Sequence, residues 1–258
     1  MAGTVIVRSL KIGEGLPKIC APITGVTDEE IRKEASLVKE SGADMAEWRM
    51  DWYADGDLTE KAGHILGCLR KILSDMPILA TFRTKKEGGE REISTEEYIS
   101  LNRAVIAGGA DLIDAELSAG EKAVREIVEA AHRNGVKVVV SSHDFDGTPS
   151  KEEIIGRLCK MQELGADLPK IAVMPKTRND VLTLLCATAE MAERHADRPI
   201  ITMSMSGIGV ISRLCGEFAG SAVTFGSAGK ASAPGQMKVE RLREGLEILH
   251  EGQGSKNL

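Results

Sequence analysis

Aromatic residues are scarce in this chain, making up only 3% of its 258 residues. So few rings cannot supply the stacking surfaces on which single-stranded nucleic acids bind. The formal net charge of −6 argues in the same direction, because nucleic acids and anionic membranes attract basic proteins. We therefore expect neither a nucleic acid nor a membrane as partner.

Long apolar runs and paired cysteines are missing as well. No stretch approaches the roughly 18 apolar residues of a membrane span, and the N-terminal MAGTVIVRSL lacks the pattern of a signal peptide. The five cysteines lie singly, without a CxxC pair, which fits neither a disulfide framework nor a zinc site. These absences predict a protein of a reducing compartment, the cytoplasm.

What the chain does have is a regular alternation of short apolar runs and helical segments. Segments such as 28–41, 95–108 and 121–134 have helical periodicity. Thr27 and Ser94 precede two of them as suitable N-caps. The apolar runs that alternate with the helices are residues 18–25, 45–51, 77–84, 112–117, 136–145, 170–175, 199–205 and 222–227.

This alternation predicts a (β/α)8 barrel, because its strands are too apolar and β-branched to face water. The rival is an open doubly wound sheet, but its GxGxxG fingerprint after the first strand is absent. We predict a single barrel domain over residues 1–258, with a short N-terminal β-hairpin within residues 1–15. The tail at residues 251–258 is expected to be disordered. A Gly-Ala-Asp triplet before the second, fourth and sixth strands suggests one turn structure used three times.

Charged and polar side chains gather at the ends of these strands, where barrel enzymes place their active sites. Each one alone could be a solvated residue, and several together could form a structural ion-pair network. Because successive strands all deliver such a group to the same end, a functional site is the better interpretation. The candidates are Glu47, Arg49, Arg83, Glu87, Asp114, Glu116, His143, Lys170 and Arg213.

Two other features were considered as sites. The acids and histidine of DWYADGDL and HDFDGT have neither calcium-loop nor zinc-helix spacing, so we expect no metal. The glycine-rich segment FGSAGKASAPGQ follows the eighth strand. It could cradle a phosphate, or it could be a mobile lid on which Ser232 and Gln236 bind ligand.

Lys170 stands directly before the apolar run IAVM, where a lysine is costly unless it is paired or neutral. In a dry pocket among arginines, desolvation and like charge both favour the neutral amine, which can form a Schiff base with a carbonyl. His143, from the preceding strand, is a natural base and then acid for the next proton transfers. The residues thus suggest a Schiff-base lyase or aldolase acting on a small anionic keto compound.

Six motifs, in order along the chain, make it resemble the type I 3-dehydroquinate dehydratase family. They are EWRMD (47–51), TFRTKKEGGE (81–90), SSHDF (141–145), PKIAVMP (169–175), GVISRL (209–214) and SAPGQ (232–236). The resemblance implies a hydro-lyase of the shikimate pathway that converts 3-dehydroquinate to 3-dehydroshikimate by syn dehydration through lysine imines. It further implies a homodimer that needs no metal or organic cofactor.

The resemblance also implies a role for each candidate. Lys170 matches the Schiff-base lysine, His143 the acid–base group, and Glu87 the carboxylate that orients the histidine. Arg213 matches the clamp for the substrate carboxylate, and a closing loop carries Ser232 and Gln236, which argues against a phosphate cradle. Glu47, Arg49 and Arg83 match residues that hold the hydroxyls and carbonyl region of the substrate.

Two alternatives remain at this point. One is another Schiff-base barrel enzyme, similar to class I aldolases, which a phosphate bound at the glycine-rich loop would favour. The other is a non-catalytic ligand-binding barrel, which would be expected to have lost Lys170 or His143.

Overall fold

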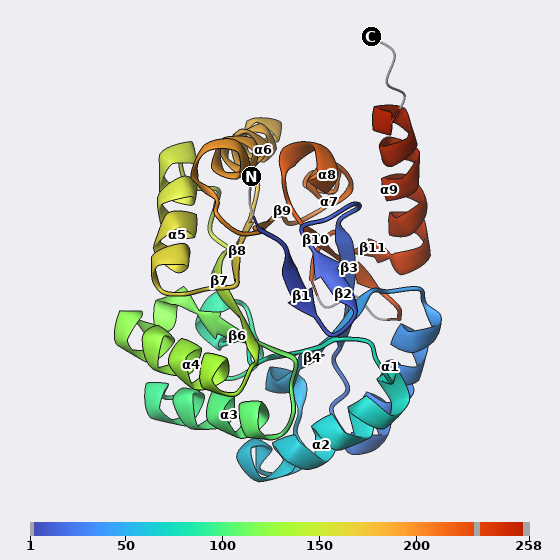
Figure 1. Ribbon diagram of the computed structural model, residues 1–258, viewed down its shortest axis with the longest axis vertical. Helices are drawn as coiled ribbons and strands as arrows, with labels where there is room; N and C mark the ends of the chain where they lie inside the picture. The colour runs from blue at the N-terminus through green and yellow to red at the C-terminus, as the bar shows by residue number, and fades with distance from the viewer. Residues whose placement is uncertain (1–2, 230–232, 255–258) are drawn as a thin grey trace.

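A ring of parallel strands forms the centre of the computed structural model, which describes residues 3–229 and 233–254 (Figure 1). From the first of these strands (Lys18–Ile23) to the seventh (Ile201–Ser204), each pairs with the next one along the chain, and the eighth (Val223–Ser227) pairs back with the first. A parallel bridge between Ile200 and Ser221 closes the ring beside β9. The strands are β3 (Lys18–Ile23), β4 (Met45–Arg49), β5 (Ile78–Thr81), β6 (Leu112–Glu116), β7 (Lys137–Asp144), β8 (Leu168–Val173), β9 (Ile201–Ser204) and β10 (Val223–Ser227). The predicted (β/α)8 barrel is confirmed.

Helices cover the outside of the ring (Figure 1). Two predicted caps are present: Thr27 accepts a hydrogen bond from the backbone of Glu30, and Ser94 forms a capping box with Glu97. The long helices are α1 (Asp28–Glu40), α2 (Leu58–Leu73), α3 (Thr95–Ala107), α4 (Glu121–Arg133), α5 (Lys151–Glu163), α6 (Arg178–Glu190) and α9 (Val239–Gly254). The shorter elements are α7 (Ile211–Leu214), α8 (Gly216–Ala219), η1 (Met50–Trp52), η2 (Lys85–Glu87), η3 (Leu117–Ala119), the π-helical η4 (Met191–His195) and β11 (Met237–Lys238), which pairs with β10.

The predicted N-terminal hairpin is formed by β1 (Val5–Val7) and β2 (Leu10–Ile12), paired antiparallel. Its buried side chains Val5, Val7 and Ile12 belong to the same apolar cluster as the inward residues of the barrel, such as Leu79 and Leu112. The hairpin therefore closes the amino-terminal end of the barrel.

The three Gly-Ala-Asp triplets form one recurring turn. In each, the glycine has a positive φ, which is 80° at Gly42 and 92° at Gly109 and Gly165, so a side chain there would be strained. The aspartate carboxylate then accepts a hydrogen bond from a backbone N–H of the neighbouring strand. The donors are Ile19 for Asp44, Ile78 for Asp111 and Val138 for Asp167, at 2.6, 2.8 and 2.8 Å. The turns thus fix the register of alternate strand pairs.

Alternation along the strands separates two environments. On β6, Ile113 and Ala115 pack in the cluster between the sheet and the helices, whereas Leu112 packs inside the barrel. Asp114 and Glu116 share the face of Leu112 and are both 1% exposed. The barrel interior is therefore apolar near the hairpin and charged at the carboxyl end of the strands.

Two boundaries differ from the sequence predictions. α9 continues to Gly254, so residues 251–254 of the tail expected to be disordered are helical. A hydrogen bond of 2.8 Å between His250 and Glu217 of α8 holds the end of this helix. β8 begins at Leu168, so Lys170 lies within the strand instead of at its entrance. Among the described residues, no helix is long and apolar enough to span a membrane.

Candidate active site

A cavity of about 110 Å³ lies at the carboxyl end of the barrel, and candidates from six segments of the chain line it. Its apolar walls include Phe145, Met203, Met205 and Phe225. Ser232 lies outside the described residues. Eight of the predicted site residues line this cavity: Glu47, Arg49, Arg83, Glu87, His143, Lys170, Arg213 and Gln236. The candidates Asp114 and Glu116 do not line it and instead form ion pairs with Arg83.

Lys170 points into the cavity from β8 and is 4% exposed. Its Nζ lies 4.0 Å from Oε1 of Glu47 and 4.3 Å from the centre of the Phe225 ring. Burial lowers the pKa of Lys170, and Arg83 lowers it further, although Glu47 and Asp114 act against this shift. The ion pair with Glu47 is long, so the surroundings favour a larger neutral fraction of the amine than in water.

His143, near the end of β7, and Glu87, in η2, form a tightly held pair. One oxygen of Glu87 accepts hydrogen bonds from Nδ1 of His143 at 2.9 Å and from its backbone N–H at 3.0 Å. With Glu87 ionised, Nδ1 carries the ring proton and Nε2 is the free base. Burial, followed by the charges of Arg83 and Lys170, lowers the pKa of His143 well below its usual value.

Gly88, which follows Glu87, lies close against the ring of Phe145. Its φ is 82°, and a Cβ at this position would lie 2.3 Å from the ring of Phe145. A side chain on residue 88 would therefore collide with Phe145 and also strain the backbone. The turn that ends η2 and presents Glu87 to His143 requires glycine.

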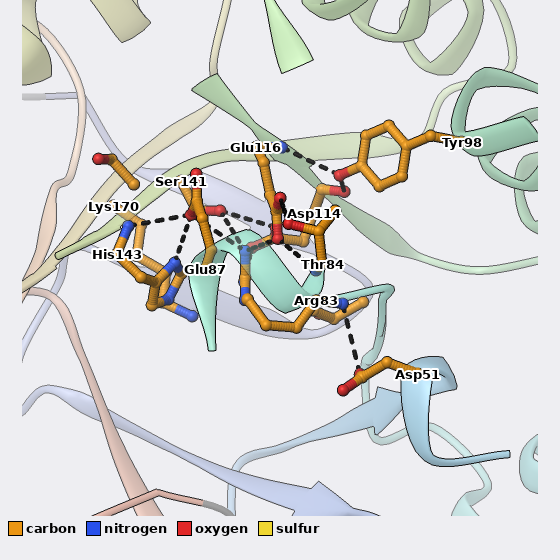
Figure 2. Close-up of polar contacts among 12 residues, drawn as sticks. Asp51, Arg83, Thr84, Glu87, Tyr98, Asp114, Glu116, Ser141, His143 and Lys170 are labelled. Carbon is orange, nitrogen blue, oxygen red and sulfur yellow. Dashed lines mark hydrogen bonds and ion pairs between the residues drawn. The ribbon is translucent and has the colours of Figure 1, made fainter. Parts of the chain in front are cut away.

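Arg83 lies at the centre of a buried charge network (Figure 2). Its guanidinium contacts Glu116 at 2.7 Å, Asp114 at 3.0 Å and the hydroxyl of Ser141 at 3.0 Å. It also lies 3.6 Å from Glu87. The interpretation as a structural ion-pair network thus holds for part of the set, since Arg83 already has protein partners while it lines the cavity.

Several partners in this network were not singled out from the sequence. Ser141 donates to Asp114 at 2.7 Å, and Thr81 donates to Glu47 at 2.9 Å. The hydroxyl of Tyr98 accepts from the backbone N–H of Glu116 and donates to the carbonyl of Asp114 (Figure 2). The first two share the inward parity of their strands with known candidates, and that signal could have found them.

Arg49 is held by a neighbour on its own segment. Its Nε and Nη2 each donate to a different oxygen of Asp51 at 2.8 Å, a bidentate pair. Asp51 also accepts from the backbone N–H groups of Arg83 and Glu90. This one carboxylate therefore fixes both the guanidinium of Arg49 and the loop that carries Glu87.

Arg213 differs from the other two arginines. It is 1% exposed, and no described carboxylate forms an ion pair with it. Among the described residues, its guanidinium donates to the carbonyls of Pro234 and Phe225, at 3.2 and 3.4 Å, and to the sulfur of Met203, and its Nε has no hydrogen-bond partner there. Burial lowers its pKa to about 10. A buried cation without an anion is suited to bind an anionic ligand.

The segment after β10 lies against this arginine. Ala233, Pro234 and Gln236 line the cavity, and Gly235 has a φ of 77°. A Cβ on Gly235 would lie 2.3 Å from the carbonyl oxygen of Ser206, so this close approach requires glycine. Within the described part of the chain, no group of three or more His, Cys, Asp or Glu side chains could hold a metal ion.

Ionisable side chains buried at one end of a closed parallel barrel define an enzyme of the (β/α)8 class. The model of the family described as type I 3-dehydroquinase matches residues 19–253. The chain belongs to this family, and the resemblance found in its motifs is confirmed.

Individual relatives are similar over almost their whole length. The 3-dehydroquinate dehydratase of Salmonella agona (strain SL483) is 55% identical over 249 residues, covering 96% of this chain and 99% of that protein. The solved type I 3-dehydroquinate dehydratase of Clostridium difficile, with covalently modified comenic acid, is 52% identical with a TM-score of 0.95, covering 98% of this chain and all of that one. The enzyme from Geobacillus kaustophilus HTA426 is 39% identical with a TM-score of 0.94, covering 98% of each chain.

Proposed function

We propose that this chain dehydrates 3-dehydroquinate to 3-dehydroshikimate by syn elimination through an imine on Lys170. The observation that carries the proposal is the position of Lys170. It is buried inside the barrel, its ion pair with Glu47 is long, and it lines the same cavity as the His143–Glu87 pair. Its neutral amine attacks the ketone of the substrate, and uptake of one proton with loss of one water gives a protonated imine. This imine withdraws electrons and makes the adjacent C–H acidic.

His143 moves the proton in the next step. Its Nε2 takes the proton from the acidified carbon and then gives it to the leaving hydroxyl, so one water is released and the histidine returns to its starting state. The depressed pKa of His143 supports this role, since the ring is then a free base at neutral pH. Glu87 holds the ring in one orientation and stabilises the imidazolium that forms.

The remaining residues hold the substrate. Arg213 clamps its carboxylate, because this guanidinium has no anion of its own among the described residues. Glu47, Arg49 and Arg83 contact the hydroxyls and carbonyl region. Gln236, and Ser232 outside the described residues, close over the ligand from the segment after β10.

We also infer a wider setting for this activity. The chain forms one domain over residues 1–258, needs no metal or organic cofactor, and acts in the cytoplasm as a homodimer in the shikimate pathway. The closed ring of strands supports a single domain, and the family supports the pathway.

The test compares two lysines on the same segment. Lys170→Ala should abolish formation of the conjugated product, followed by its ultraviolet absorbance, while binding of the substrate persists. Lys176→Ala is the matched control, because Lys176 is exposed just after Pro175 and should leave activity near that of the unaltered protein. Full activity in Lys170→Ala would refute the proposal.

A further inference from the structure

The His143–Glu87 pair lines two separate hollows. One is the cavity of about 110 Å³ that contains Lys170. The other, of about 310 Å³, opens outside the barrel and is lined by the same pair together with Lys86, Leu117, Ser118, Ser142 and Arg157. The two residues thus form a wall between the site and this outer hollow.

Strand geometry explains how one pair reaches both hollows. His143 faces inward at the end of β7, and Ser142 faces outward toward α5. Nη1 of Arg157, on α5, lies 3.4 Å from the hydroxyl of Ser142 and 3.7 Å from Asp144. On the other side, Ser118 lines the hollow beside Lys86 and Leu117. The outer hollow therefore has a polar lining that water can wet up to the carboxylate.

The segment after β10 forms part of the wall of the front cavity. Ala233, Pro234 and Gln236 line it, and the guanidinium of Arg213 donates a hydrogen bond to the carbonyl of Pro234. A water molecule takes about 30 Å³ in the liquid, so the cavity holds only a few waters, which a covalently bound substrate would displace.

While the bound substrate fills this cavity, the proposed reaction still has to exchange protons with the solvent. A neutral amine and a ketone give a protonated imine and one water only when one proton is taken up. Hydrolysis of the product imine consumes one water and releases that proton again. The proton that His143 removes from carbon leaves with the hydroxyl as water, so it cannot be the proton that imine formation takes up.

We propose that the outer hollow is a second solvent entrance, through which the His143–Glu87 pair exchanges protons with water while the front cavity is filled. This inference rests on the proposed function. Ser118 and Ser142 line this entrance, and their small side chains leave room for water beside Glu87 and His143.

The test measures exchange of the carbon-bound ring proton of His143 for deuterium, by mass spectrometry of the peptide that contains it. Exchange is followed in the free enzyme and after borohydride has reduced the imine on Lys170, which leaves the ligand in the front cavity. We expect the two rates to differ by less than about threefold, because solvent still reaches the ring from outside.

Leucine and alanine variants then distinguish two effects on exchange: leucine fills the outer hollow, whereas alanine only removes a hydroxyl. In the reduced adduct, Ser118→Leu should slow exchange at His143 by about tenfold or more, whereas Ser118→Ala should stay near the unaltered protein. Ser142→Leu and Ser142→Ala repeat the comparison should the first leucine impair folding. Ser36→Leu, on the exposed face of α1, controls for an added surface leucine. Ser118→Leu should also lower kcat while leaving KM within about twofold.

Two results would refute the proposal that solvent reaches His143 through the outer hollow. One is that the adduct by itself stops exchange at His143, which would show that solvent reaches the ring through the front cavity. The other is equal exchange in the leucine and alanine variants. Absence of any adduct on Lys170 is a different result, since it refutes the proposed function and removes the need for an entrance.

Discussion

Replacing Arg213 should weaken substrate binding without weakening the fold. Methionine at this position keeps most of the length of the side chain, so Arg213→Met leaves less empty space than alanine would. A charge-assisted hydrogen bond contributes about 1.5–3 kcal/mol, so loss of the carboxylate clamp should raise KM about 10- to 150-fold at similar kcat. Initial rates over a range of substrate concentrations measure this directly.

Replacing most buried arginines lowers the free energy of unfolding, but replacing Arg213 should not. Burial lowers the pKa of Arg213 from 12.5 to about 10, which corresponds to a cost of about 3 kcal/mol for keeping the folded side chain charged. The cost is fully present at neutral pH and disappears as the pH rises through 10 toward the unfolded value. The carbonyls of Pro234 and Phe225 lose their donor in the variant, at about 1 kcal/mol each.

The free energy of unfolding of Arg213→Met should therefore be unchanged or higher by about 1–2 kcal/mol, measured by urea denaturation without ligand. Arg213→Lys should restore binding only in part, because an ammonium lacks the planar fork of the guanidinium. A variant that binds substrate normally, or that loses several kcal/mol of stability, would show that Arg213 is a structural residue.

Three further outcomes test other parts of the site. His143→Ala should still form an adduct that borohydride reduces, while its turnover falls about 10²–10⁴-fold; near-normal turnover would move the proton-transfer role, with Glu87 the first alternative. Because the folded pKa of His143 lies below the unfolded value, the neutral ring favours folding above about pH 6.5, and this contribution is lost as the pH falls through that value toward the folded pKa. His143→Gln should therefore lose less unfolding free energy between about pH 7 and pH 5 than the unaltered protein, and parallel curves would contradict the shift. Activity should survive exhaustive chelation with EDTA, and loss that a divalent ion restores would reveal a metal requirement.

Local chemistry is what made the fold predictable from the sequence. The caps at Thr27 and Ser94 and the positive-φ glycines of the Gly-Ala-Asp turns depend on residues close along the chain, and the alternation of apolar runs and helices then leaves few architectures. The end of α9 could not be predicted in this way, because it depends on Glu217, more than thirty residues upstream.

The site was predictable as a set of residues but not as a set of contacts. The sequence placed Glu47, Asp114 and Lys170 together among the charged residues at the ends of the barrel strands. The sequence could not show that Arg83 already has Asp114 and Glu116 as partners, whereas Arg213 has none among the described residues. Both arginines follow apolar strands, and only the folded chain determines which carboxylates reach each one.

The most direct measurement is mass spectrometry of the protein incubated with 3-dehydroquinate and borohydride, followed by peptide mapping. An imine on Lys170 is reduced to a stable amine, so the added mass should lie on the peptide that contains Lys170 and vanish in Lys170→Ala. Added mass on Lys176, or none with Lys170 intact and the enzyme active, would contradict covalent catalysis by Lys170.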